Sequence, residues 1–196
     1  LAGQVAAESQ SHIGMARRLA TSHEARSRRR ETLLAALSIN GVTSAVNTAE
    51  RWLDIAKKDA EALTTERDLE ERNAALRTMG LQPGDAIPNN MKSDLKALEE
   101  AQKRRATRSL RDGIDRILVD LLSLYRDVLT LQINAQTPLI NAELLNQITE
   151  AAQSTTPAQT IEKLEAIAKA RLRIDRNVRD LMVLESLGVS LRIKRG

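Results

Sequence analysis

Residues Asp112 to Asn146 decide the fold class, and they read DGIDRILVDLLSLYRDVLTLQINAQTPLINAELLN. Apolar side chains recur along this stretch at steps of three and four residues. They are Ile114, Ile117, Leu118, Leu121, Leu122, Tyr125, Val128 and Leu129. Because this spacing places them on one face of a long α-helix, we predict that this face is buried in a helical core.

The same helix contains the triplet Tyr125-Arg126-Asp127, in which the chain's only tyrosine precedes a charged pair. We predict that Tyr125 packs inward with its hydroxyl at the edge of the core. Arg126 and Asp127 are then expected to face water or another helix. A direct functional contact by the triplet is the alternative interpretation.

The composition of the 196 residues favours an all-α helical bundle. Hydrophobic residues make up 42% of the chain, which is enough for a core and excludes wholesale disorder. Aromatic residues make up only 1%, whereas sheets normally draw on aromatic and β-branched side chains. Alanine, leucine, arginine and glutamate are abundant, and all four favour helix.

The sequence excludes most kinds of catalytic site. It has no cysteine and only two histidines, His12 and His23, so neither a catalytic triad nor a zinc site can be assembled convincingly. A glycine-rich phosphate loop of the GxxxxGK[ST] type is also missing. We therefore expect a non-catalytic chain without cofactor, metal or small-molecule substrate. The lack of cysteine and of a membrane-spanning apolar run makes us expect a cytoplasmic protein.

Two long helices are predicted on either side of a loop. An apolar stripe predicts a helix from about Thr43 to Met79, and a second helix resumes near Lys92 or Ser93. The loop from Gly80 to Asn90 is predicted from Pro83, Gly84 and Pro88. The stripe comprises Val42, Ala45, Ala49, Trp52, Leu53, Ala56, Ala60 and Leu63.

The C-terminal part predicts shorter helices, for a total of five or six. Asn141 is a candidate N-cap for a helix through Ala152, and Thr156-Pro157-Ala158-Gln159 has the composition of a capping box. Side chains expected to point inward from the next two helices are Ile161, Leu164, Ile167, Ala168 and Ile174, followed by Leu181, Leu184, Leu187 and Leu191.

Two basic runs permit, but do not require, contact with nucleic acid, and the net charge is only +4. The first run contains Arg26, Arg28, Arg29 and Arg30, for which a solvated helix face or linker is the simpler interpretation. The second is the helix face formed by Lys103, Arg104, Arg105, Arg108 and Arg111. Because no aromatic residues lie among them, this face offers phosphate contact at most.

The stretch from Lys96 to Leu145 resembles the C-terminal region of the delta-prime subunit of bacterial DNA polymerase III, especially its actinobacterial form. The resemblance covers roughly residues 90–190. It rests on an ordered set of short motifs, namely Gln102 to Arg108, Tyr125 to Leu129, Leu139-Ile140-Asn141, Thr156-Pro157 and Asn177-Val178.

Residues 11–20 are similar to the end of the lid of an AAA+ module, where active relatives carry a sensor-2 motif of the form G-S-x-R-x-A-L. Ser11 stands in place of the glycine and Gly14 in place of the arginine. Arg17 or Arg18 could substitute only in a shifted register. The resemblance implies a degenerate sensor-2 region at Gly14, Arg17 and Arg18, and an ATPase module preceding Leu1 that would carry an arginine finger.

The resemblance also implies a domain organisation and partners. Residues 1–40 would be the end of an AAA+ lid with a basic connector, and residues 41–196 a helical collar domain with a charged helical insertion around 64–111. Collar domains hold clamp-loader subunits, here gamma/tau and delta, in a five-membered ring that loads the sliding clamp during DNA replication. Such a subunit would contact DNA only indirectly. The candidate subunit interface is Tyr125, Arg126, Asp127 and Asn141.

Two other functions stay open at this point. The basic runs are compatible with a helical nucleic-acid-binding module, which would show salt-dependent DNA binding. The charged helices between Glu61 and Arg111 are compatible with a coiled-coil adaptor, which would form an elongated dimer.

Overall fold

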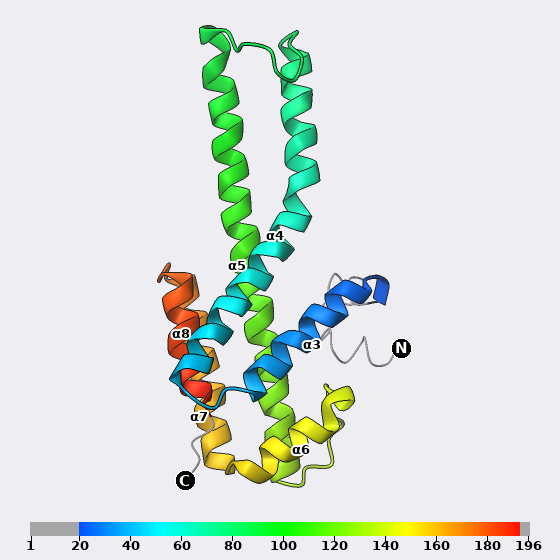
Figure 1. The fold of residues 1–196 in the computed structure, drawn as a ribbon, viewed down its shortest axis with the longest axis vertical. Coiled ribbons are helices and arrows are strands. Elements are labelled where there is room, and N and C mark those ends of the chain that lie inside the picture. Colours follow the sequence, from blue (N-terminus) through cyan, green and yellow to red (C-terminus); the bar gives the residue numbers. More distant parts are fainter. Residues whose placement is uncertain (1–19, 193–196) are drawn as a thin grey trace. The chain divides into compact units, whose positions relative to one another are not determined.

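The computed structural model describes residues 20–192, and its regular structure in that range is entirely helical (Figure 1). This confirms the predicted all-α class. The helices are α3 (His23–Leu37), α4 (Val42–Thr78), α5 (Lys92–Gln132), α6 (Leu145–Ser154), α7 (Pro157–Asp175) and α8 (Asp180–Leu191), with 3-10 turns η1 (Asn89–Met91) and η2 (Ala142–Leu144). None of the helices in this range is both long enough and apolar enough to cross a membrane.

The described residues form two compact units. Residues 20–53 and 115–192 make the first, which we call the bundle, and residues 54–114 make the second, which we call the hairpin. The boundary between them therefore falls within α4 and within α5. The predicted domain boundary at residue 40 does not coincide with it, since α3 belongs to the bundle. The predicted charged insertion at 64–111 lies within the hairpin.

The bundle is built around the C-terminal half of α5. Six of the eight predicted core positions of this helix are buried, and Leu122 and Leu129 are half-buried. The helix also buries Leu124, so more of its circumference is covered than a single stripe requires. Trp52 of α4 is fully buried, and its indole N–H donates to the carbonyl of Thr32 at 3.2 Å. Other fully buried side chains of the bundle are Leu33, Ile39, Leu144, Ile148, Ile167 and Leu184.

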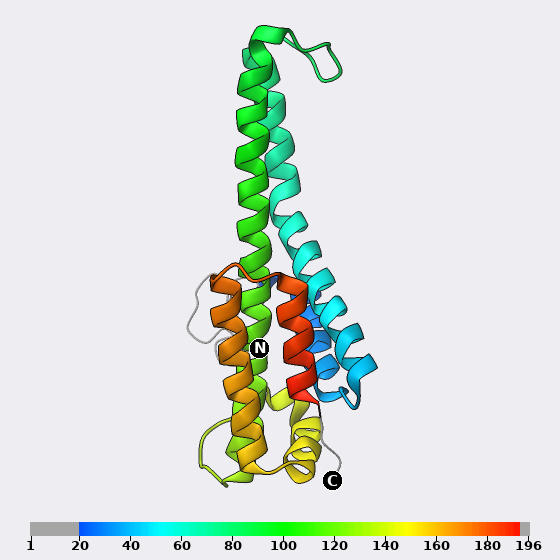
Figure 2. The ribbon, with the colours of Figure 1, turned by 90° about the vertical axis from the view of Figure 1, so that its left-hand side faces the viewer.

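Helix α8 approaches α4 closely at Gly188. A Cβ atom at this position would lie 2.8 Å from the carbonyl oxygen of Ala45, so only glycine fits there. Helix α7 lies beside α8, as the views in Figures 1 and 2 agree. The three helices thereby close one side of the bundle.

The capping box before α7 is confirmed. The amide of Gln159 donates to the Thr156 hydroxyl at 3.3 Å, and the amide of Thr156 donates to the Gln159 side chain at 2.9 Å. These two bonds satisfy backbone donors that the first turn of a helix leaves unpaired. Pro157, which lacks that donor, occupies the first helical position.

Two inward predictions for α7 are wrong. Ile161 is 47% exposed and Ala168 is exposed. The buried positions of this helix are instead Thr160, Lys163, Ile167, Ala170 and Ile174. Because the stripe runs through Lys163, it is rotated from the one that hydropathy alone predicts. On α4, likewise, the buried stripe is shorter than predicted, since Val42 and Leu63 at its two ends are each 55% exposed.

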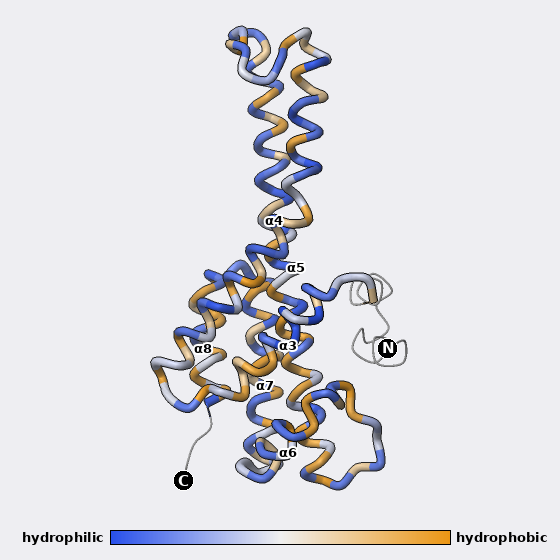
Figure 3. The backbone as a smooth tube through the Cα atoms, turned by 45° about the vertical axis from the view of Figure 1, so that its right-hand side comes forward, coloured by the Kyte–Doolittle hydropathy of each residue, from blue (hydrophilic) through white to orange (hydrophobic). Residues whose placement is uncertain are grey.

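The hairpin has a thin core and many polar contacts between its two helices. Its largest buried side chains away from the bundle are Leu76 and Leu95. Figure 3 shows hydrophilic positions along both of its helices. Arg105 of α5 bonds Asp68 and Glu71 of α4, the latter at 3.0 Å. Arg72 pairs with Glu99 at 2.9 Å, and the side chain of Gln102 donates to the carbonyl of Asp68 at 2.9 Å.

The predicted loop between the two long helices is confirmed. Helix α4 ends at Thr78 and α5 begins at Lys92. Gly80 and Gly84 take positive φ angles of 73° and 102°, which other residues adopt with strain. The amide of Gln82 donates to the carboxylate of Asp85 at 2.7 Å, which closes the turn locally.

Candidate functional site

A buried carboxylate, Asp127 of α5, is the centre of a polar cluster inside the bundle. It is 0% exposed. Its oxygens accept from the amide of Ile140 at 3.1 Å, from the amide of Asn141 at 2.7 Å, and from the Asn141 side chain at 2.9 Å. Arg126 adds a fourth bond at 3.0 Å. A charge buried this deeply is tolerated because these donors replace its lost hydration.

Asn141 connects Asp127 to two further side chains. Its side-chain amide donates to the hydroxyl of Ser123 at 3.2 Å, and its side-chain oxygen accepts from Arg29. Asn141 precedes η2, as expected of an N-cap, but its side chain makes no cap hydrogen bond. The side-chain role predicted for it is therefore wrong, because Asp127 and Arg29 use the groups that would have capped the helix.

Arg29 of α3 anchors this helix to the cluster. Its side chain is 6% exposed, and its Nε donates to Asp120 of α5 at 2.9 Å. Glu143 lies 3.5 Å from the same guanidinium. The predicted solvated face is thus wrong for Arg29, whereas Arg30 is exposed. The difference arises because α5 and the 141–143 turn supply acceptors that lie far away in the sequence.

The four predicted interface residues are brought together, but three of them point into the bundle. Tyr125 is 3% exposed, as predicted, and Asp127 and Asn141 are fully buried. Asp127 does not face water or another helix, because it binds the backbone of the 138–141 turn. Arg126 is the accessible member, with a 37% exposed side chain that also donates to the carbonyl of Pro138 at 3.0 Å. An interface role for the set stays a prediction.

Tyr125 packs against a buried lysine of α7. The ammonium of Lys163 lies 5.3 Å from the centre of the tyrosine ring, and this residue is 6% exposed. The geometry is that of a cation–π contact. Burial lowers the pKa of Lys163 and raises the pKa of Tyr125. The phenol is therefore held neutral, and the ammonium gives up its proton more readily than an exposed lysine does.

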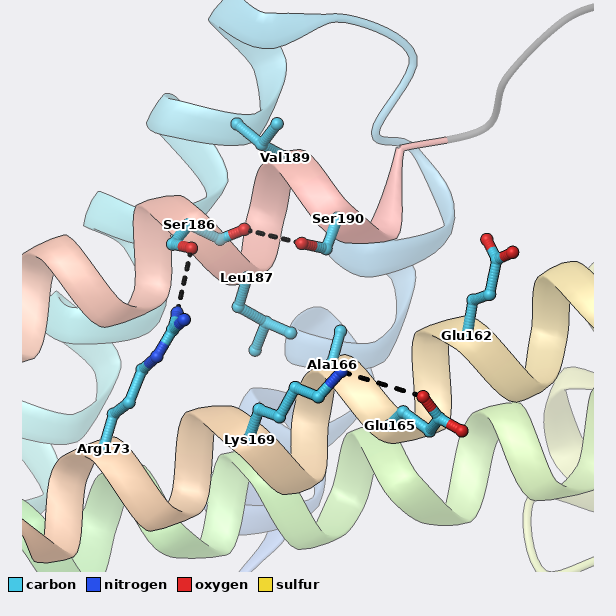
Figure 4. Close-up of a pocket in the computed structure, with 9 residues that line it drawn as sticks. All are labelled: Glu162, Glu165, Ala166, Lys169, Arg173, Ser186, Leu187, Val189 and Ser190. Atoms are coloured by element: carbon cyan, nitrogen blue, oxygen red, sulfur yellow. Dashed lines mark hydrogen bonds and ion pairs between the residues drawn. The ribbon is translucent and has the colours of Figure 1, made fainter.

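A groove with a volume of about 350 Å³ runs between α7 and α8 (Figure 4). Its α7 wall carries Glu162 and Glu165 toward one end and Lys169 and Arg173 toward the other. Lys169 lies 3.7 Å from Glu165, and Arg173 donates to the hydroxyl of Ser186 on α8 at 3.2 Å. The remaining lining residues are Ala166, Leu187, Val189 and Ser190.

Five exposed apolar side chains, of which only Val189 lines this groove, lie on α7, on α8 and in the segment between them, and we call them together the α7–α8 surface. They are Ile161, Leu172, Val178, Met182 and Val189, which are 40–58% exposed. Since α8 also buries Val183, Leu184, Leu187 and Leu191, it is apolar on more than one side. A helix of this kind is typically covered on more than one side. The surface is therefore suited to contact with another protein.

No family model, curated protein or solved structure matches this chain. The geometry of the site therefore stands without a relative to compare it with.

The described residues hold no group of three or more His, Cys, Asp and Glu side chains that could bind a metal ion. The candidate sensor-2 positions Gly14, Arg17 and Arg18 lie outside the residues that the structure describes. The bundle thus presents a polar core cluster and an open surface.

Sequence reasoning missed Asp120 and Ser123 of the polar cluster, but a signal for them was present. Asp120, Ser123, Asp127 and Thr130 follow one another at steps of three, four and three residues. They form a polar stripe on the same helix that carries the apolar stripe, and the structure buries the last three. A polar stripe beside an apolar one predicts a buried hydrogen-bond network. Its distant partner, Arg29, has no comparable local signal.

Proposed function

We propose that this chain is the collar region of a delta-prime-like subunit of a bacterial DNA polymerase III clamp loader. The observation that carries the proposal is the bond between two motifs of the resemblance. Asp127, from Tyr125-Arg126-Asp127, holds the backbone of Ile140 and Asn141, from Leu139-Ile140-Asn141. The fixed order and spacing of these motifs thereby acquire a physical reason. The all-helical bundle is also the fold that the resemblance implies.

In this role the chain is non-catalytic and acts by holding subunits together in the cytoplasm. ATPase modules would supply the nucleotide chemistry of such a ring, and the parent assembly is a nucleotidyltransferase. In this role the bundle itself would contact DNA only indirectly, through the loaded clamp and the ATPase modules.

The partner surface in this proposal is the α7–α8 surface, and its occupant is a collar helix of a neighbouring gamma/tau or delta subunit. The exposed apolar side chains of this surface would pack against that helix. Glu162 and Glu165 would pair with basic residues at one end of the partner helix. Lys169 and Arg173 would pair with acidic residues at its other end. This charge order fixes the direction in which the partner helix would lie.

The proposal is tested by co-purification of the 196-residue chain with gamma/tau and delta subunits. We expect a complex that elutes as one species in size-exclusion chromatography. Leu172→Glu combined with Met182→Glu should abolish it, because each change places a charge on a surface that becomes buried. The matched control is Leu63→Glu with Leu69→Glu, since these hairpin leucines are 55% and 58% exposed. Failure of the unaltered chain to bind any of these subunits would overturn the proposal.

The coiled-coil adaptor gains no support from the hairpin. The charged helices that motivated it already pair within one chain, through Arg105 with Asp68 and Glu71, and through Arg72 with Glu99. An adaptor of that kind would need these positions to face a second chain.

A further inference from the structure

The N-terminal half of α5 has an inner and an outer side within the hairpin. Leu95 is buried, and Gln102 and Arg105 bond α4. At 3.6 residues per turn, the exposed basic residues of this segment lie away from these three. They are Lys96, Lys103, Arg104 and Arg108, and we call them the α5 basic face.

The charges of the α5 basic face are little compensated by carboxylates. In the part of the chain that the structure describes, Lys96, Lys103 and Arg108 have no ion-pair partner. Arg104 has only Glu100, at 4.0 Å, and both side chains are more than half exposed. An exposed pair of this length contributes little. Nearby carboxylates are engaged elsewhere, since Asp68 and Glu71 bind Arg105. The face is thus positive although the hairpin contains many acidic residues.

The length and chemistry of the face fit a row of phosphates. Lys96 and Arg108 are separated by twelve helical steps, or about 18 Å along the axis. A duplex presents phosphates along such a length at about 3.4 Å per base pair on each strand. Lysine and arginine contact these phosphates without regard to base sequence. The chain's aromatic residues, Trp52 and Tyr125, both lie outside residues 54–114, so the hairpin offers no stacking platform for a single strand.

We propose that the α5 basic face binds the phosphate backbone of a nucleic-acid duplex without sequence specificity. The site would lie on the hairpin, and it is independent of the collar role that we propose for the bundle. The partner is recognised by a regular array of phosphates, which double-stranded DNA and double-stranded RNA share.

The test is fluorescence anisotropy with the 196-residue chain and a labelled DNA duplex of about 24 base pairs, at several salt concentrations. Neutralisation of about four phosphates gives a slope near −3.6 in log K against log salt. Affinity should therefore fall on the order of 100-fold between about 50 and 200 mM salt. A duplex RNA and a single strand of equal length are run in parallel. We expect both duplexes to bind more tightly than the single strand.

Two variants distinguish this face from the overall charge of the chain. Lys96→Gln, Lys103→Gln, Arg104→Gln and Arg108→Gln together should abolish duplex binding while retaining helix, since glutamine is a good helix former. The matched control loses the same charge through Arg30→Gln, Lys57→Gln, Arg77→Gln and Arg176→Gln, all at exposed positions. It should bind within about threefold of the unaltered chain, and circular dichroism checks that both variants keep their helix.

Several outcomes would overturn the proposal. They are equal losses in the two variants, absence of binding by the unaltered chain at the lowest salt, and tighter binding to the single strand than to either duplex. Equal binding to polyglutamate would also overturn it, because the face would then be a general anion-binding surface. Arg104→Lys with Arg108→Lys should keep most of the affinity, since phosphate contact requires the charge rather than the guanidinium shape.

Discussion

Asp127 holds Asn141 by two hydrogen bonds, one from its backbone amide at 2.7 Å and one from its side chain at 2.9 Å. These bonds fasten the chain reversal after α5 to the interior of that helix. Arg29 extends the attachment to α3, because it binds both Asn141 and Asp120. Three segments of the bundle therefore depend on one buried cluster.

Replacing Asp127 with asparagine should lower the stability of the bundle strongly. The side chain would keep its size, but its amide would face the donors that the carboxylate now binds. We expect a loss of about 3 kcal/mol, as is typical when one partner of a buried charged network is removed. For a chain of this length, this loss corresponds to a melting temperature lower by roughly 6–12 °C. The measurement is urea and thermal unfolding followed by circular dichroism.

The control for this variant is Asp54→Asn, since the Asp54 side chain is 58% exposed in an ion pair with Lys58. It should change stability by less than about 0.5 kcal/mol. Similar unfolding midpoints for the two variants would show that the cluster around Asp127 does not stabilise the bundle.

Two glycine substitutions should have different effects although both residues lie inside helices. Alanine gains about 1 kcal/mol over glycine in helix propensity at either site. At Gly188 the new methyl group would lie 2.8 Å from the backbone oxygen of Ala45, which cannot move away as a side chain could. At Gly113 the nearest atom, the oxygen of Ala56, is 3.2 Å away. We expect Gly188→Ala to destabilise by about 1–2 kcal/mol and Gly113→Ala to be nearly neutral.

Chemical unfolding of both variants checks this prediction, with the unaltered chain as reference. If Gly188→Ala proved as stable as Gly113→Ala, the close approach of α8 to α4 would be absent in solution.

The helix positions were predictable because their signals are local. The three- and four-residue spacing in 112–129, the capping box at Thr156, and the turn residues Pro83 and Gly84 each act within a few residues of themselves. These features correctly placed both ends of α4, and the first residues of α5 and α7, to within one or two residues. The same locality explains why the loop between the long helices was found.

The site was less predictable because its partners are far apart in the sequence. Arg29 is 91 residues from Asp120 and 112 from Asn141, so no local pattern distinguishes it from the exposed arginines beside it. Lys163 misled the prediction for α7 in a different way. Its side chain is buried with the ammonium over the Tyr125 ring, whereas hydropathy assigns lysine to the surface.

The buried lysine should make stability depend on pH in the alkaline range. In the unfolded chain Lys163 has the ordinary pKa of about 10.4, while burial lowers the pKa in the folded state. Between the two values the unfolded state binds more protons, so stability should rise as pH increases toward 10.4. Lys163→Met removes this dependence. Tyr125 acts oppositely above about pH 10, because its pKa is raised in the folded state.

We expect the stability difference between Lys163→Met and the unaltered chain to change between the lowered pKa of Lys163 and about pH 10.4, in the direction that favours the unaltered chain as pH rises. Urea midpoints at a series of pH values measure it. Lys169→Met serves as control, since the Lys169 side chain is 67% exposed. The stability of this variant should change with pH in the same way as that of the unaltered chain. Parallel profiles for all three proteins would contradict the burial of Lys163.

The hairpin should depend on Arg105 more than on any apolar contact, because this arginine binds two carboxylates across its helices. Arg105→Met should speed amide hydrogen exchange in residues 64–78 and 92–105, with α6 and α7 unchanged as an internal reference.

The bond from Arg105 lowers the pKa of Glu71, so this stabilisation is present above the ordinary glutamate pKa. It is lost as pH falls through the lowered value. The difference in amide exchange rate between the variant and the unaltered chain should therefore shrink below about pH 4. A difference that persists below this pH would show that apolar contacts, rather than Arg105, stabilise the hairpin.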